Sequence, residues 1–239
     1  MNRKIGVSNT GGVYIGENIQ TKPHLHQAIT IIISFGDQFD FSCESETGSC
    51  SGVIIQPNTI RQFKSKKNSS TAFIHIEPFS EQGLKLTDRT RPFKTLSQIQ
   101  IKNIIKFLKI WLSHNKSHEK STEKLIDSVT SEISTNTITI DQRIEKAIDL
   151  IRKVESPTLK SIATTINLSA FRLSHLFKQE TGITFEKFVL YTKLVKSLKA
   201  IYENQSLTQS SYSGNFSDQA HFTRTYNNAF GVLPSKTLK

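Results

Sequence analysis

The chain has 239 residues and a formal net charge of +11, and this length suits about two domains with buried cores. Its longest apolar run, residues 28–35, is far shorter than the roughly 18 residues that a membrane-spanning helix needs. The first residues contain no apolar signal core, so we expect a cytoplasmic protein without membrane contact. A disulfide between Cys43 and Cys50 across a hairpin is one alternative, but a reducing compartment favours two free thiols.

The first third of the chain has the pattern of a β domain. Short runs rich in β-branched and aromatic residues alternate with turn-forming residues, at 29–35, 39–43, 52–56 and 72–77. Evenly spaced short strands predict a sandwich or barrel. Three segments, PHLHQAITI (23–31), VIIQPNTIRQF (53–63) and FIHIEPFSEQG (73–83), are similar to the corresponding parts of cupin-like sensor domains.

This resemblance directs attention to two histidines. His24 and His26 are two residues apart, so on a strand they would point the same way, as two metal ligands can. In metal-binding cupins a carboxylate follows the pair and a third histidine comes from a later strand. Here Arg61, which cannot bind a metal, takes the place of that later histidine, and His75 is the substitute to consider. We expect no metal, no other cofactor and no catalytic residue.

A small-molecule pocket formed by His24, His26 and Arg61 is the interpretation we favour. A guanidinium inside an apolar barrel needs an anionic or strongly polar partner. Glu77 is an internal candidate, and an acidic ligand would serve through a two-pronged contact with Arg61. Two alternatives stay open: Arg61 points to solvent from the turn at 57–58, or the barrel is purely structural or binds a protein partner.

Two apolar stripes at helical spacing occupy residues 83–136. The first contains Ile101, Ile104, Ile105, Leu108, Trp111 and Leu112, and the second contains Leu125, Ile126, Val129 and Ile133. A polar segment, 114–122, separates them. The stripes fit packing against the barrel or against each other, and a homodimer interface is the alternative. We expect an interdomain linker at 134–140 and then a helix over 141–154.

Residues 158–182 have the pattern of a helix, a turn and a second helix. Thr158 and Ser169 are suitable N-caps for the two helices, Asn167 tolerates the left-handed turn between them, and Gly182 fits the stop. The inward face of the second helix contains Leu173, Leu176 and Phe177. Its outward face is polar and basic with one aromatic residue, and it carries Phe171, Ser174, His175 and Lys178.

A second copy of this pattern runs over residues 206–234. Ser217 is the expected N-cap of its second helix, Phe222, Tyr226 and Ala229 face inward, and Gly231 ends it. Gln219, Ala220, Thr223 and Arg224 lie on another face. Arginine can bond a guanine edge in two places and glutamine an adenine edge. A helix-turn-helix places its second helix in a DNA major groove.

Residues from about 140 to 239 resemble the DNA-binding domain of AraC/XylS-type transcription regulators. The matching segments are LSHLFKQETGITFEKF (173–188) and FSDQAHFTRTYNNAFGVLPS (216–235). The resemblance implies two helix-turn-helix subdomains, a linking helix over about 185–202, and helices from about Ala170 and Asp218 that enter successive major-groove segments. It implies DNA contacts at Phe171, Ser174 and His175 in the first of these helices, and at Gln219, Ala220, Thr223 and Arg224 in the second. Arg172 lies beside the first set of contacts, and Lys178 is a candidate phosphate contact.

The chain departs from the family pattern before the second turn. Ser210 and Ser211 stand where the family has an apolar residue and alanine, and Asn215 stands where it has glycine. An unpaired buried hydroxyl costs on the order of 1–3 kcal/mol. We therefore expect a less stable second subdomain, which Ser210→Ile would stabilise, and a larger contribution to DNA binding from the first.

Charge follows the same division of the chain. Residues 137–239 carry 14 Lys and Arg against 8 Asp and Glu, whereas residues 1–82 carry seven of each. A neutral front and a basic rear fit a sensor joined to a polyanion binder. No helix has the amphipathic pattern of a membrane-surface binder.

We expect an α+β protein with three parts: a cupin-like β-barrel or sandwich (1–82), a helical connector (83–136) and an all-α double helix-turn-helix domain (137–239). The predicted function is a ligand-responsive activator that binds double-stranded DNA and RNA polymerase on the nucleoid, and it is not an enzyme. The alternatives are a regulator controlled by its abundance or a protein partner, a metal cupin enzyme with a DNA-binding tail, and a sequence-blind DNA-packaging protein.

Overall fold

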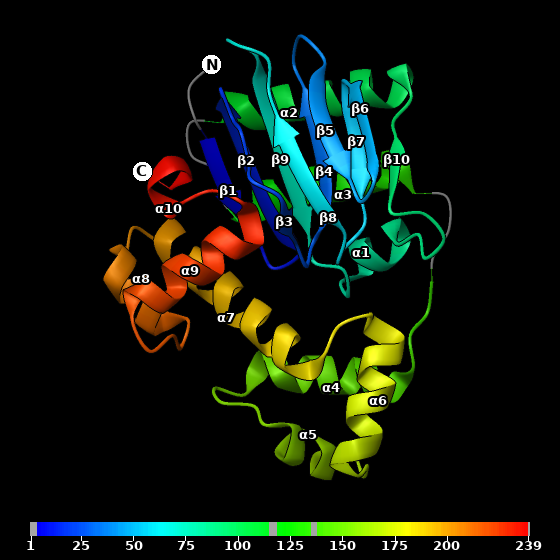
Figure 1. The fold of residues 1–239 in the computed structure, drawn as a ribbon, viewed down its shortest axis with the longest axis vertical. Helices are drawn as coiled ribbons and strands as arrows, with labels where there is room; N and C mark the ends of the chain where they lie inside the picture. Colours follow the sequence, from blue (N-terminus) through cyan, green and yellow to red (C-terminus); the bar gives the residue numbers. More distant parts are fainter. Residues whose placement is uncertain (1–3, 115–118, 135–137, 239) are drawn as a thin grey trace. The chain divides into compact units, whose positions relative to one another are not determined.

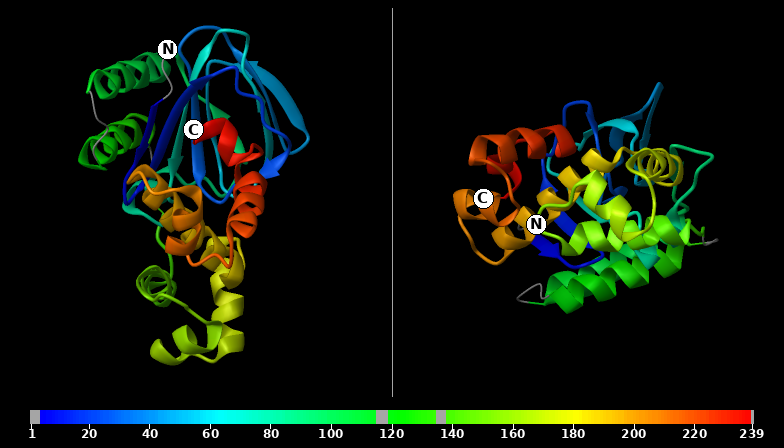
Figure 2. Two further views of the ribbon diagram at one scale, coloured as in Figure 1. Left: turned by 90° about the vertical axis from the view of Figure 1, so that its left-hand side faces the viewer. Right: turned by 90° about the horizontal axis from the view of Figure 1, so that it is seen from below.

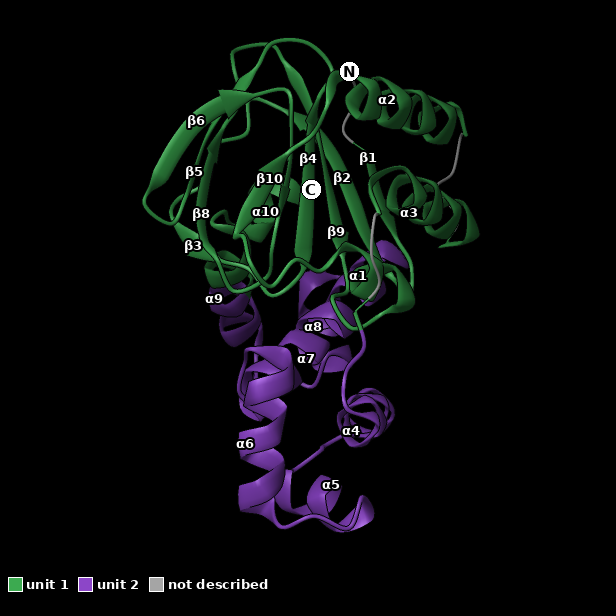
Figure 3. Ribbon diagram, turned by 90° about the vertical axis from the view of Figure 1, so that its right-hand side faces the viewer, with its two compact units in different colours: residues 1–138, 226–239 green, residues 139–225 purple. Residues whose placement is uncertain are grey.

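The structure is a computed structural model that describes residues 4–114, 119–134 and 138–238. The chain divides into two compact units, shown in Figure 3. Unit 1 comprises residues 1–138 and 226–239, and unit 2 comprises residues 139–225. Among the described residues, no helix is long and apolar enough to cross a membrane.

Unit 1 is built on two antiparallel sheets (Figure 1). The six-stranded sheet has the order β1-β2-β9-β4-β7-β10, and the four-stranded sheet has the order β3-β8-β5-β6. The strands are β1 (Lys4–Val7), β2 (Gly11–Glu17), β3 (His24–Leu25), β4 (Ile29–Ser34), β5 (Phe39–Cys43), β6 (Glu46–Cys50), β7 (Gly52–Ile55), β8 (Ile60–Lys64), β9 (Ser70–Ile76) and β10 (Phe93–Thr95).

The helices are α1 (Glu81–Leu86), α2 (Gln98–Ser113), α3 (Glu119–Ile133), α4 (Gln142–Lys153), α5 (Leu159–Thr165), α6 (Ala170–Thr181), α7 (Phe185–Tyr202), α8 (Leu207–Ser213), α9 (Gln219–Phe230) and α10 (Pro234–Thr237). The fold class predicted from the sequence, α+β with a C-terminal helical region, is confirmed. The expected linker at 134–140 lies partly outside the described residues, as does the polar segment 114–122.

Strand β4 is buried along its whole length because both faces of the six-stranded sheet are covered. On one face, Ile29, Ile31 and Ile33 pack with the apolar stripes of α2 and α3. On the other face, Ile32 belongs to an aromatic-rich core shared with the four-stranded sheet, where Phe63 is another member. Helices α2 and α3 lie side by side on the outer face of the sheet (Figure 2). The apolar stripes of the connector therefore form core within this unit.

The side chain of Lys4, on strand β1, caps the C-terminal end of α2. Its ammonium group donates hydrogen bonds to the carbonyl oxygens of Trp111, Leu112 and His114, at 2.8, 3.3 and 2.7 Å. The last carbonyls of a helix have no partners within the helix, so Lys4 supplies both the donors and a favourable positive charge. The ammonium also lies 4.6 Å from the centre of the Trp111 ring.

The two cysteines lie at opposite ends of the β5–β6 hairpin. The register pairs Cys43 with Glu46 and Cys50 with Phe39. Both thiols are free, as the sequence predicts, and burial raises the pKa of each to about 11. They are protonated at neutral pH and therefore poorly reactive.

Local capping signals define the first helix-turn-helix of unit 2 as predicted. The Thr158 hydroxyl caps α5 in a reciprocal pair with Ser161, and the Ser169 hydroxyl accepts from Arg172 N at the start of α6. Asn167 and Gly182 adopt positive φ values of 57° and 75°. Leu173, Leu176 and Phe177 are buried.

The linking helix α7 coincides with the predicted range, but the second helix-turn-helix begins differently. The cap of α9 is Asp218, not Ser217, because the Asp218 carboxylate accepts from His221 N at 2.7 Å. Ser217 instead donates to Asp218. An aspartate cap also places negative charge at the positive end of the helix dipole.

Tyr226 marks the start of the C-terminal segment of unit 1, so the unit boundary lies inside the continuous helix α9. The carbonyl oxygen of Gly231 accepts a hydrogen bond from Lys22 N at 3.0 Å. Gly231 has φ +68°, and a Cβ there would lie 2.6 Å from both His24 Nδ1 and the Lys22 carbonyl oxygen. Only glycine fits this approach of the segment to the barrel.

Candidate nucleic-acid interface and the buried arginine–histidine cluster

The predicted contact face of α6 is exposed to solvent. Phe171 is 83% exposed, the highest fraction among the large exposed apolar residues. Arg172, His175 and Lys178 are exposed, and Ser174 is partly buried. The opposite side of the helix forms the core of the subdomain. A large aromatic side chain held out in water among basic groups fits a surface that contacts a partner rather than a packing face.

The corresponding face of α9 is also accessible. Gln219, Ala220 and Arg224 are exposed, and Thr223 is partly buried. The Thr208 hydroxyl donates to Gln219 Oε1 at 2.6 Å. This bond fixes the amide so that its nitrogen is left to donate, as reading an adenine N7 requires.

In unit 1, Arg61 is a buried cation that neutral acceptors surround. It is 4% exposed, so the alternative that it points to solvent is wrong. Its Nη1 donates to Thr30 Oγ1 at 2.9 Å, Nη2 to the Gln56 carbonyl oxygen at 2.5 Å, and Nε to the Thr59 carbonyl oxygen at 3.2 Å. Glu77 is not among these partners. Burial lowers the pKa of Arg61 to about 10, so the group keeps its charge at neutral pH.

The three histidines of this region gather around Arg61. His24 lies directly opposite Arg61 in the β3–β8 register. His26 stacks on His75 with ring centres 4.5 Å apart, and Phe230 contacts both rings from the C-terminal segment. The structure thus brings His24, His26 and Arg61 together, as the sequence analysis expects.

A hydrogen bond fixes the tautomer of His26, and a second one involves the ring of His75. His26 Nδ1 accepts from Ala28 N at 2.9 Å. Thr30 Oγ1, which accepts from Arg61, lies 3.2 Å from His75 Nδ1, and its hydroxyl can donate there. Burial, and next the positive charge of Arg61, lower the pKa of His75 to about 3. Burial is also the main cause that lowers the pKa of His24 to about 4 and that of His26 well below its usual value.

The chemistry of this cluster is that of neutral imidazoles around one cation. Within the described ranges, no three His, Cys, Asp or Glu side chains are placed to hold a metal ion. Sequence reasoning missed Thr30, Gln56 and Thr59 as the partners of Arg61. The only signal was the PN turn before Arg61, because Thr30 comes from a strand 31 residues away.

Comparison with known proteins agrees with this geometry. Residues 162–239 match the helix-turn-helix domain family. This match covers most of the region that resembles the DNA-binding domain of AraC/XylS-type transcription regulators. The Msm operon regulatory protein of Streptococcus mutans is 31% identical over 83 residues, which are 34% of this chain and 30% of that protein. The probable transcriptional regulator LumQ of Photobacterium leiognathi is 22% identical over 228 residues, 89% of this chain and 90% of that protein.

The fold of the whole chain is that of ToxT from Vibrio cholerae. An apo ToxT variant matches with a TM-score of 0.68 at 10% identity, over 98% of each chain. ToxT bound to an unsaturated fatty acid matches with a TM-score of 0.62 at 13% identity, over 99% of this chain and 94% of that one. The helix-turn-helix region of this chain is thus accompanied by an N-terminal β domain, as the resemblance implies.

Proposed function

We propose that the protein is a sequence-specific transcription regulator in which α6 and α9 read two successive major-groove segments. The observation that carries this proposal is the exposed row Phe171, Ser174 and His175 on the second helix of an AraC-type helix-turn-helix. Gln219, Ala220, Thr223 and Arg224 form the corresponding row on α9. Lys178 and Arg172 flank the first row and are suited to phosphate oxygens. Such a regulator works on DNA in the cytoplasm, and as an activator it contacts RNA polymerase.

The DNA contacts are tested by titration with DNA from upstream of the protein's own gene, in competition with random DNA. Affinity falls steeply as salt rises because counterions are released. Lys178→Ala weakens binding to all sequences about equally. Arg224→Ala relaxes the preference at one base position, at a cost of roughly 1–3 kcal/mol if it reads guanine. Lys187→Ala, an exposed charge on α7, is the matched control, and equal affinity for both DNAs contradicts the proposal.

The proposal includes a small anionic effector that binds near His24, His26 and Arg61. A ToxT structure contains an unsaturated fatty acid, which is an acid with a large apolar part. In this chain, the support is a buried guanidinium with no ion pair among the described residues. Nη1 has two N–H groups and, among the described residues, one hydrogen-bond acceptor, Thr30, so one donor is left for a ligand. Arg61→Lys is the variant to compare with the wild type in an effector-dependent reporter assay, and a normal response contradicts this site.

A second candidate is a regulator of the same kind that has no ligand. It is favoured by the neutral acceptors Thr30, Gln56 and Thr59, which hold Arg61 without outside help. In this case the barrel is structural, and control comes from abundance or from a protein partner such as a second copy. Reporter activity that tracks protein concentration alone, with no response to any acid in a screen, distinguishes this candidate from the first.

A further inference from the structure

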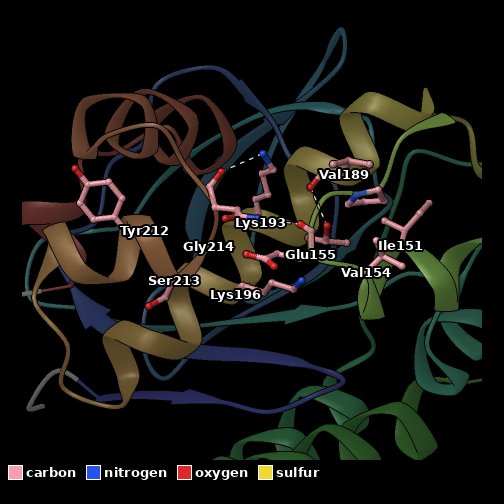
Figure 4. A pocket seen from close by; sticks show the side chains of 12 residues that line it. Ile151, Val154, Glu155, Val189, Lys193, Lys196, Tyr212, Ser213 and Gly214 are labelled. Atoms are coloured by element: carbon pink, nitrogen blue, oxygen red, sulfur yellow. Dashed lines mark hydrogen bonds between the residues drawn. The ribbon is translucent and has the colours of Figure 1, made fainter. Parts of the chain in front are cut away.

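Unit 2 contains a pocket of about 230 Å³ away from the predicted contact rows (Figure 4). Three segments form its walls: the end of α4 with the following loop, the middle of α7, and the end of α8 with the turn before α9. Val189, Lys193 and Lys196 recur at intervals of four and three along α7, so one face of this helix lines the pocket. None of the nine residues assigned above to DNA contact is among the lining residues.

The polar side of the pocket is cationic. Lys193 Nζ donates to the Asn215 carbonyl oxygen at 3.0 Å, which leaves two of its three donors. Neither Lys193 nor Lys196 forms an ion pair with any described residue, and both are partly buried. Glu155 is the one acidic residue in the lining. Two partly desolvated ammonium groups that face a partly open pocket attract an anion more strongly than the same groups on a flat, fully solvated surface.

The other side of the pocket is apolar. Ile151, Val154 and Pro157 come from α4 and its following loop, and Val189 lies opposite them on α7. A pocket of about 230 Å³ suits a small ligand with a short apolar body.

We propose that this pocket binds a small organic anion, a carboxylate or a phosphate ester, whose apolar body lies against Val189 and Val154 and whose charge lies between Lys193 and Lys196. Such a ligand touches elements of both helix-turn-helix subdomains at once. Its occupancy therefore changes how firmly α4 and α8 are held together. An effect on DNA affinity follows only if the proposed DNA-binding function is correct, whereas binding itself is measured without DNA.

The first experiment uses the full-length wild type and four probes of nearly equal size in calorimetric titrations. The anions are benzoate and phenyl phosphate, and they separate a carboxylate source from a phosphate source. Benzamide is neutral and benzylammonium is a cation. We expect at least one anion to bind about tenfold or more tightly than benzamide, and no binding of benzylammonium. Anions that bind no better than benzamide overturn the proposal.

The second experiment locates the site. Lys193→Met and Lys196→Met keep the aliphatic stems and weaken anion binding about tenfold each, whereas Lys196→Arg retains it. Lys187→Met, on the same helix but outside the pocket, leaves binding unchanged. Val189→Phe fills the apolar side and abolishes binding with both lysines present. Binding that is unchanged in the double variant Lys193→Met/Lys196→Met places the anion elsewhere and overturns the proposal.

DNA titrations of the same variants supply the last outcome. If Lys193→Met and Lys196→Met weaken DNA binding without any added anion and do not affect benzoate or phenyl phosphate, the lysines contact DNA phosphate and the pocket is not a ligand site. If neither the wild type nor any variant binds DNA while anion binding follows the expected order, the pocket proposal stands and the proposed DNA-binding function is wrong.

Discussion

The side-chain amide of Asn215 donates a hydrogen bond of 2.9 Å to the carbonyl oxygen of Glu155, sixty residues earlier in the chain. Asn215 holds the positive φ of 61° that the turn before α9 requires. Glycine would satisfy the backbone equally well, but it has no side chain to reach the loop after α4. The departure from the family's glycine therefore adds a tie between the two helix-turn-helix subdomains.

Two substitutions at Asn215 separate the turn from the tie. Asn215→Gly keeps the backbone conformation and loses one hydrogen bond, which costs about 0.5–1.5 kcal/mol. Asn215→Ala loses the same bond and also the short polar side chain that makes the left-handed conformation accessible to asparagine, so it destabilises by up to about 1–2 kcal/mol more than Asn215→Gly. Urea unfolding measures both changes. An alanine variant as stable as the glycine variant contradicts this account of the turn.

Ser210 and Ser211 form a matched pair of buried serines, each with no solvent exposure. Ser210 Oγ has no hydrogen-bond partner, whereas Ser211 Oγ donates to the Thr208 carbonyl oxygen at 2.7 Å. We expect Ser210→Ala to raise the free energy of unfolding by about 1 kcal/mol and Ser211→Ala to lower it by a similar amount.

The larger change Ser210→Ile tests how much room the same site has. The sequence argument expects it to stabilise the protein, but at a position with no exposed surface the added carbons cost about 1–3 kcal/mol if the neighbours cannot move. Thermal unfolding of the alanine and isoleucine variants side by side decides the question. A more stable isoleucine variant shows that the packing between α7 and α8 is loose.

The hydrogen bonds of Lys4 to the end of α2 predict that substitutions of this residue lower the stability of unit 1. Lys4→Met removes three hydrogen bonds to the end of α2 and also the ammonium group over the Trp111 ring, so we expect a loss of about 1–3 kcal/mol. Lys4→Arg restores part of it because a guanidinium also donates. Trp111 is the single tryptophan of the chain, so its fluorescence follows this region in a urea titration. An unchanged midpoint for Lys4→Met shows that the cap contributes nothing.

The buried histidines predict that stability falls in weak acid. Burial lowers the pKa of His75 to about 3 and that of His24 to about 4, while in the unfolded chain both lie near 6.5. Below pH 6.5 the unfolded state therefore binds more protons than the folded state. Stability is complete above that pH and declines towards pH 4, by up to about 1.4 kcal/mol per pH unit for each fully buried imidazole.

Urea titrations at pH 7, 6 and 5 measure this dependence. His75→Phe keeps a ring in the stack with His26 and Phe230. It reduces the slope of unfolding free energy against pH by the contribution of one imidazole. A wild type that is equally stable at all three pH values contradicts the burial of neutral histidines.

The sequence predicts unit 2 more fully than unit 1, and the reason is physical. Caps such as Thr158 and Ser169 act on backbone within three residues, so their effect can be read locally. Strands β1, β2 and β8 have weaker alternation and depend on pairing across the sheet. Arg61 could be singled out as a buried-charge candidate, but its partners could not be named because Thr30 reaches it only through tertiary packing.

The C-terminal segment of unit 1 bears on how the protein can evolve. Regulators built from separable modules can exchange sensors by recombination at a linker, here near residue 138. In this chain such an exchange would also remove the barrel groups that Phe230 and Gly231 contact, including His26 and the Lys22 amide. A transplanted sensor would need its own fit to the last fourteen residues. Chimeras made with a single crossover near residue 138 should therefore be less stable than chimeras that exchange residues 1–138 and the last fourteen residues together.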